Sequence, residues 1–184
     1  MGEKFNIVVA DDNDALREQA EGVLDCAASG VPGLDVSVTD VCDGVFAFDH
    51  VIGHGADLWL SDIKMPRLSG PESVREIFRN SGAERQVPCV AFMTCGDFSD
   101  SDRELLAGLM EDPRVLGMFQ KPLDLNSVGA LLRIASVRKG LLGAGVLSED
   151  PVVCEAVETV HSLTRQVCES NRIPLSPRFL PNGR

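Results

Sequence analysis

The chain has 184 residues, of which 44% are hydrophobic and 24% are charged. This composition is typical of a soluble globular protein with one domain and an appendage. No apolar run approaches the roughly 18 residues that a membrane span needs. The net charge is −11, and because residues 141–184 hold five acidic and four basic residues, residues 1–140 carry −10. Such a field repels a phosphate backbone, so we do not expect the chain to bind nucleic acid directly.

The N-terminus and the cysteines indicate the cytoplasm. The first five residues, MGEKF, lack the apolar region of a signal peptide. Six cysteines form no C-x-x-C pair, which predicts reduced and mostly buried thiols in place of disulfides or a metal cluster. They are Cys26, Cys42, Cys89, Cys95, Cys154 and Cys168.

Apolar strand-like runs alternate with helix-like segments, which is the pattern of a parallel sheet covered by helices on both faces. The predicted strands are 5–10, 35–41, 57–61, 87–93 and 117–120. The predicted helices are 14–27, 44–52, 70–80, 99–110 and 125–137. Pro71 suits the first turn of its helix, and Ser101 with Glu104 predicts a capping box for residues 99–110. The fold class is therefore α/β, a doubly wound five-stranded parallel sheet.

The sequence after residue 139 predicts a C-terminal extension. Residues 140–145 are glycine-rich and indicate a linker, and residues 149–170 suit a helix with one apolar seam. The seam residues are Val153, Val157, Val160, Thr164 and Val167. Docking of this helix on its own domain is favoured over a coiled coil, because two heptads are marginal alone. The proline-rich residues 173–184 are predicted to be irregular or disordered. We expect two units, 1–139 and 140–184.

Polar residues follow four of the predicted strands. Asp11 and Asp12 follow the first, Asp62 the third, Thr94 the fourth and Lys121 the fifth. Open α/β sheets bind ligands at the carboxyl ends of their strands, so these five side chains should converge.

Three carboxylates that lie close together need a cation. Two like charges about 4 Å apart repel by roughly 4 kcal/mol at an effective dielectric near 20, so the carboxyl pKa values rise or a cation binds. Hard oxygen ligands suit Mg²⁺. A carboxylate can also attack phosphorus to give an aspartyl phosphate. The metal and a lysine would then neutralise charge on the transferring group.

Four sequence blocks resemble the signature motifs of bacterial two-component response-regulator receiver domains of the chemotaxis type. The blocks are IVVADDND, DLWLSDIKMPRLSG, VAFMT and FQKP, and the similarity spans residues 4–138. The resemblance implies a flavodoxin-like sheet of strand order 2-1-3-4-5.

The resemblance also implies a role for each site residue. Asp62 would be the phosphoacceptor. It would bind Mg²⁺ together with Asp12 and the backbone carbonyl of Lys64, while Asp11 would act largely through a metal-bound water. Thr94 would be the switch hydroxyl.

Lys121 would be the phosphate partner, and its bond to Pro122 would be cis. The phosphate donor would be a histidine kinase or a phosphotransfer protein. Only residues 140–184 follow the receiver, too few for most output domains. Output to an unknown downstream protein would therefore pass through protein contacts on the face of the fourth helix, fifth strand and fifth helix. The 149–170 helix and a homodimer are open as parts of that output.

Some residues depart from the family pattern. Met118 stands where many receivers have an aromatic switch residue, and Phe119 should face the opposite side of the strand. Lys64 and Gly96 would flank the phosphate with effects that the sequence does not decide. His50 and His54 are four residues apart, but nearby glycines favour a loop or surface position over a metal pair.

Single residues also have structural interpretations. Asp11 or Asp12 could cap the first helix, although Asp14 is better placed for that. Two rival functions remain open. One is a degenerate receiver that acts as an interaction module without phosphorylation. The other is a phosphatase with an aspartate nucleophile, which usually has a second aspartate where this chain has Lys64.

Overall fold

The computed structural model describes residues 4–80, 87–96, 98–140 and 151–180. Five strands form one parallel sheet in the order β2-β1-β3-β4-β5. The strands are β1 (Phe5–Ala10), β2 (Val36–Val41), β3 (Leu58–Asp62), β4 (Cys89–Thr94) and β5 (Val115–Gln120). The predicted fold class and strand order are confirmed.

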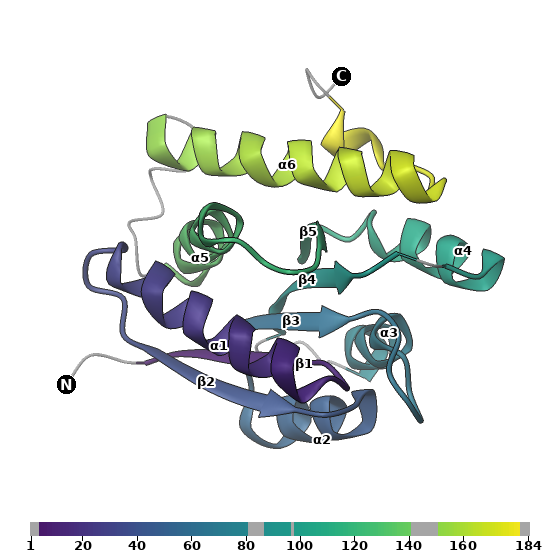
Figure 1. The fold of residues 1–184 in the computed structure, drawn as a ribbon, viewed down its shortest axis with the longest axis horizontal. Helices are drawn as coiled ribbons and strands as arrows, with labels where there is room; N and C mark the ends of the chain where they lie inside the picture. Colours follow the sequence, from purple (N-terminus) through teal and green to yellow (C-terminus); the bar gives the residue numbers. More distant parts are fainter. Residues whose placement is uncertain (1–3, 81–86, 97, 141–150, 181–184) are drawn as a thin grey trace.

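Helices cover both faces of this sheet, as Figure 1 shows. The helices of the structure are α1 (Asp14–Ser29), α2 (Gly44–His54), α3 (Gly70–Asn80), α4 (Asp100–Leu109), α5 (Leu125–Lys139) and, at the β5 edge, α6 (Pro151–Asn171). A short 3-10 turn, Pro177–Phe179, follows α6. Among the described residues, no helix has the length and apolar character to cross a membrane.

The sheet divides the apolar interior into two cores. Side chains of α1 and α5 pack on one face, with Leu24 and Leu131 among the fully buried residues. Side chains of α2, α3 and α4 pack on the other face, around Trp59 on β3. Strands covered on both sides must be apolar along their whole length, which explains why β3 is buried at all five positions.

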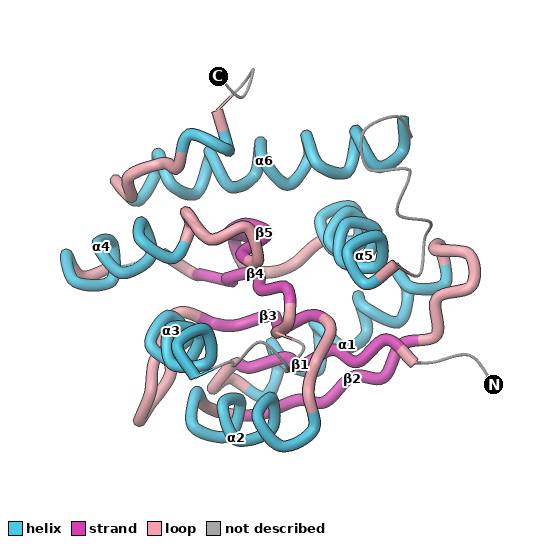
Figure 2. Tube along the Cα trace, turned by 180° about the vertical axis from the view of Figure 1, so that it is seen from behind, coloured by secondary structure: helices cyan, strands magenta, loops and turns pink. Residues whose placement is uncertain are grey.

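Helix α6 lies across the β5 edge of the sheet, beside α5 (Figures 1 and 2). Its seam residues Val153, Val160, Thr164 and Val167 are buried, and Val157 is half-buried. The prediction that this helix docks on its own domain is therefore confirmed. The following segment is irregular, as one of the two alternatives predicted, apart from the short 3-10 turn. It is packed in part, because Phe179 is buried. The predicted linker 140–145 lies outside the described residues except for Gly140.

Helix starts differ from the prediction at two places. Asn13, and not Asp14, caps α1, with its side chain accepting from two backbone N–H groups. The capping box of α4 is formed by Ser99 and Asp102, two residues earlier than the predicted Ser101 and Glu104. In both cases two polar residues within three positions could cap the helix. Which of them does so depends on where the loop before the helix leaves the sheet.

Two other expectations about side chains need correction. All six cysteines are free, but four of them are exposed and only Cys168 is buried. The loop alternative for His50 and His54 was wrong, because α2 extends to His54. The surface alternative holds for His54, which is exposed. The two rings stack with centroids 4.7 Å apart. Gly53 lies inside the helix, and Gly55 ends α2 in a conformation that favours glycine, φ 78.

Candidate functional site

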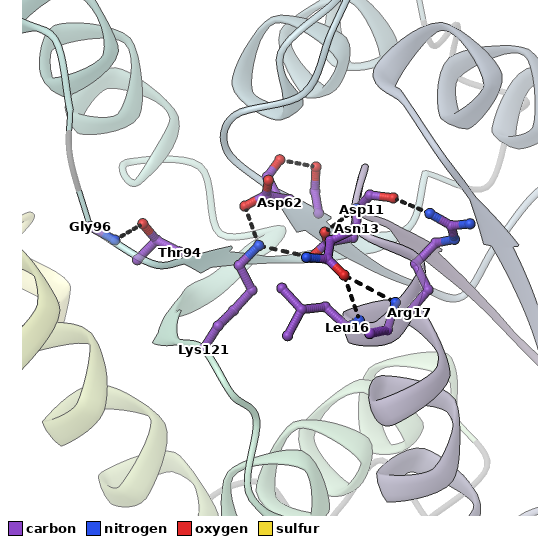
Figure 3. Close-up of polar contacts among 10 residues, drawn as sticks. Asp11, Asn13, Leu16, Arg17, Asp62, Thr94, Gly96 and Lys121 are labelled. Atoms are coloured by element: carbon purple, nitrogen blue, oxygen red, sulfur yellow. Dashed lines mark hydrogen bonds and ion pairs between the residues drawn. The ribbon is translucent and has the colours of Figure 1, made fainter.

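The five predicted side chains lie at the carboxyl ends of their strands. Ala10 pairs with Ser61 and Asp62 pairs with Met93, so the ends of β1, β3 and β4 are level. The backbone N–H of Lys121 donates to the carbonyl of Thr94 at 2.7 Å, which continues the ladder past the end of β5. The parallel register therefore brings residues distant in sequence to one rim (Figure 3).

Lys121 is the centre of the site. Its Nζ lies 2.8 Å from Asp11 Oδ2 and 2.8 Å from Asp62 Oδ1. All three side chains are buried, so water screens these ion pairs less than it would at the surface. The peptide bond from Lys121 to Pro122 is cis, as the resemblance implied.

Asp11, Asp12 and Asp62 form a group that can hold a cation. One carboxylate oxygen from each lies within 4.8 Å of the others. Asp11 and Asp62 are buried, whereas Asp12 is exposed. Together with Lys121 the four side chains carry a net charge of −2, and a hard divalent ion with oxygen ligands and one open side fits this donor set.

The electrostatic environment shifts two pKa values. Burial raises the pKa of Asp62, and the charge of Asp11 adds to this, while the bond from Lys121 acts against it. Burial alone would lower the pKa of Lys121, but its bonds to Asp11 and Asp62 outweigh burial and raise it. The lysine is therefore held in its charged form, and Asp62 is a more basic carboxylate than usual.

The loop after Asp62 depends on Gly70. A Cβ atom at this position would lie 2.0 Å from the carbonyl oxygen of Asp62 and 2.4 Å from Ser61 Oγ. Gly70 N–H instead donates to the carbonyl of Ile63 at 3.2 Å. The first turn of α3 can therefore pack directly behind Asp62, which fixes the backbone that presents this carboxylate.

Thr94 is buried at the end of β4, but its hydroxyl is engaged by its own loop. Thr94 Oγ1 accepts a hydrogen bond from the backbone N–H of Gly96 at 2.9 Å (Figure 3). The residue thus lies on the predicted rim in a conformation stabilised by Gly96, which has φ 95.

Two residues that support Asp11 were not singled out in the sequence. Asn13 donates its backbone N–H to Asp11 Oδ1 at 2.9 Å, and Arg17 Nη1 donates to the Asp11 carbonyl at 2.8 Å. Asn13 could have been found as an N-cap type residue before an amphipathic helix. Arg17 forms a local ion pair with Asp14, but nothing local indicates its bond to the Asp11 carbonyl or its ion pair with Asp40, which joins α1 to β2.

The remaining predicted positions are placed as follows. Met118 and Phe119 face opposite sides of β5 and belong to different cores, as expected. Lys64 is exposed two residues after Asp62. Its carbonyl as a metal ligand stays a prediction.

A comparison with models of protein families found no match. Solved structures of receiver domains are similar in fold. A signal receiver domain of an HD domain-containing protein from Pseudomonas fluorescens Pf-5 has a TM-score of 0.59 at 17% identity, and the match covers 76% of this chain and 99% of that one. A response regulator receiver domain from Clostridium thermocellum has a TM-score of 0.55 at 22% identity, covering 75% and 98%.

A third similar structure is the signal receiver domain of the putative response regulator NarL from Mycobacterium tuberculosis. Its TM-score is 0.54 at 24% identity, with 73% of this chain and 98% of that chain covered. These comparisons do not distinguish a chemotaxis type from other receivers. Together with the strand order, they show that the chain has the receiver-domain fold of response regulators, to which it adds the helix α6.

Proposed function

We propose that this chain is a phosphoacceptor receiver of a two-component or phosphorelay system, with Asp62 as the acceptor. The observation that carries the proposal is the position of Lys121 Nζ, 2.8 Å from both Asp62 and Asp11, within a group of three carboxylates. A purely structural ion pair needs one carboxylate for one lysine. The excess negative charge in this group supports a site for a cation and a phosphoryl group.

In the proposed reaction, an oxygen of the Asp62 carboxylate attacks the phosphorus atom of a phosphohistidine on a histidine kinase or phosphotransfer protein. The new O–P bond forms as the N–P bond breaks, and the imidazole leaves with the electron pair. When bound, Mg²⁺ neutralises negative charge on the phosphoryl oxygens. Asp11, Asp12, Asp62 and the Lys64 carbonyl would hold it.

The residues of the chain have separate tasks in this reaction. Burial and the neighbouring Asp11 keep Asp62 basic, which favours its attack. Lys121 stays charged and would bond to the phosphoryl group once Asp62 is phosphorylated. Thr94 would exchange its bond with Gly96 for one to a phosphoryl oxygen. A donor of this kind acts in the cytoplasm, which we propose as the compartment of this chain.

Output would pass to another protein by contact. The chain would assist only its own phosphorylation and dephosphorylation. Lys64 is exposed and stands where a phosphatase with an aspartate nucleophile usually has a second aspartate as its general acid, which counts against that activity.

The test is incubation with acetyl phosphate and Mg²⁺, followed by intact mass measurement. The wild type should gain one phosphoryl group that is labile to hydroxylamine. It should gain none when EDTA replaces Mg²⁺ during the incubation. Asp62→Asn should gain none. Asp25→Asn, which changes an exposed aspartate on α1, is the matched control and should behave like the wild type.

Two other outcomes would contradict the proposal. Continuous release of phosphate from p-nitrophenyl phosphate would favour the phosphatase. A folded protein that takes up no phosphate from acetyl phosphate or from a phosphohistidine donor would favour the interaction module.

A further inference from the structure

Helix α6 joins the two cores at the β5 edge of the sheet. Ala156 and Val160 in its first half belong to the core on the α1 and α5 face. Val167 and Cys168 in its second half belong to the core on the α2, α3 and α4 face. The views in Figures 1 and 2 agree that α6 runs along the side of the sheet where β5 would otherwise be an open edge.

The groove under α6 is shaped for a helix. The buried backbone N–H of Met118 on β5 donates to Thr164 Oγ1 at 3.1 Å, so an edge group of the sheet is satisfied by the helix. A Cβ atom on Gly117 would lie 2.4 Å from Thr164 Oγ1 and 3.0 Å from Val160 Cγ1. Glycine at this position therefore allows the helix to approach the strand closely.

The C-terminal end of α6 bonds to α4 and lies near the loop that carries Thr94. Arg103 Nε, on α4, donates to the backbone carbonyl of Asn171 at 2.8 Å. Gly96 lies near the same residue, since a Cβ atom built on it would be 3.7 Å from Asn171 Oδ1. The N–H of Gly96 is the group that holds the Thr94 hydroxyl. Thr94 is therefore bonded to a residue that lies close to the end of α6.

This arrangement links the phosphate site to the docking of α6. If Thr94 turns toward a phosphoryl group, the N–H of Gly96 loses its acceptor and the loop against Asn171 must rearrange. The contacts at the C-terminal end of α6 weaken first, while Val153 and Ala156 still hold its N-terminal end.

We propose that the groove along β5 and α5 is a helix-binding surface that α6 occupies while Asp62 is unphosphorylated, and that phosphorylation loosens α6 so that an amphipathic helix of a partner protein replaces it. The proposal rests on the proposed phosphorylation of Asp62. A helix is the expected occupant because the groove offers a glycine for close approach, an N–H for a small hydroxyl residue, and apolar walls on either side.

Two cysteines on α6 can report whether the helix is docked. Cys168 lies on α6 and is buried, and burial raises the pKa of its thiol to about 11, so it reacts slowly with alkylating agents while α6 is docked. Cys154 lies on the same helix and is exposed. The experiment measures iodoacetamide alkylation of both cysteines by peptide mass spectrometry, with the intact mass reporting phosphate uptake in the same sample.

Phosphorylation by acetyl phosphate and Mg²⁺ should speed the alkylation of Cys168 by about tenfold and leave Cys154 unchanged. Asp62→Asn should show no change at either cysteine. A chain that takes up one phosphate while Cys168 alkylation stays constant overturns this inference and leaves the proposed function intact. A chain that takes up no phosphate overturns both.

Two variants test the groove without phosphate. Thr164→Val leaves the N–H of Met118 without its acceptor, and Gly117→Ala pushes against Val160 and Thr164. Both should speed Cys168 alkylation and raise the fraction phosphorylated at a fixed acetyl phosphate concentration, because the coupling is reciprocal. Thr159→Val is the matched control, since that hydroxyl donates to the Glu155 carbonyl one turn earlier in α6. Equal effects of Thr159→Val and Thr164→Val would overturn the inference.

The occupant is tested with a fluorescein-labelled peptide of residues 151–171, used as a stand-in helix. Fluorescence polarisation should show at least about tenfold tighter binding to the phosphorylated protein than to the unphosphorylated one. Light scattering on the unlabelled protein distinguishes the alternative occupant. A phosphorylated chain that forms dimers in proportion to α6 release would show that a second copy fills the groove, which would overturn the assignment to a partner protein.

Discussion

The two ends of the sheet each hold a buried lysine in contact with an aspartate, and the two lysines have different surroundings. At the carboxyl end, Lys121 lies between Asp11 and Asp62. At the amino end, Lys139 Nζ lies 2.7 Å from Asp57 Oδ2. Both lysine side chains are nearly buried, at 6% and 9% exposure, so burial does not distinguish the two pairs.

The two lysines differ in the bonds that they make. Asp57 accepts from Lys139 and from the backbone N–H of Asn6 at 2.7 Å, and Lys139 also donates to the carbonyl of Lys4. This pair ties the start of the sheet to the end of α5. At the carboxyl end, Lys121 bonds to two carboxylates of a group of three. The proposed cation site rests on this group of carboxylates.

The largest effect is expected from breaking the Asp57–Lys139 pair. Lys139→Met removes the ammonium group that bonds the buried Asp57 carboxylate, which should lower the free energy of unfolding by about 3 kcal/mol. Urea denaturation followed by the fluorescence of Trp59, the single and fully buried tryptophan, measures this loss. Phosphate uptake by the remaining folded protein should be unchanged.

Two controls show whether the loss of the ion pair is the cause. Lys4→Met removes an exposed lysine at the same end of the sheet and should change stability by no more than about 0.5 kcal/mol. Adding Asp57→Asn to Lys139→Met should recover part of the loss, because the buried group that Lys139 bonds is then uncharged. A double variant as unstable as the sum of both single variants would point to packing instead.

The fold was predictable because its signals are local and repeated. The apolar run of β1 and the helix Gly70–Asn80 were placed with the bounds that the structure shows. The other elements differ by one or two residues at an end. Helix ends such as Ser99 depend on which of several polar residues meets the first free N–H groups, and that choice is made by the loop geometry.

The site residues could be proposed from sequence because a parallel sheet gathers strand ends at one rim. The bond between Lys121 and Asp11 could not be predicted from sequence. These residues are 110 positions apart, and the distance between them depends on the register of four strands, β1, β3, β4 and β5. The support of Asp11 by Arg17 depends likewise on a contact from α1 to β2. The Asp57–Lys139 pair was missed because neither residue stands next to a recognisable motif.

A smaller effect is expected from adding or removing a divalent cation. Mg²⁺ at ten times its dissociation constant should raise the free energy of unfolding by about 1.4 kcal/mol relative to the protein in EDTA. Asp12→Asn should reduce this increment because it removes one carboxylate of the group, whereas Lys139→Met should keep it. Urea denaturation at constant ionic strength is the measurement. An equal increment from NaCl alone would show general screening and no specific site.

The smallest effect is a pH dependence of stability that arises at the carboxyl end of the sheet, where Asp62 lies. Because the pKa of Asp62 is raised in the folded protein, the folded state binds a proton more tightly than the unfolded chain does. The stability linked to this proton is fully present below the unfolded carboxyl pKa, about 3.9, and is lost as the pH rises through the folded value. In EDTA, Asp62→Asn should therefore be more stable than the wild type at pH 7, and this advantage should shrink as the pH falls toward 4. Urea midpoints at several pH values give the comparison. An advantage that stays constant with pH would mean that the variant improves packing, and that the Asp62 charge is already compensated by Lys121.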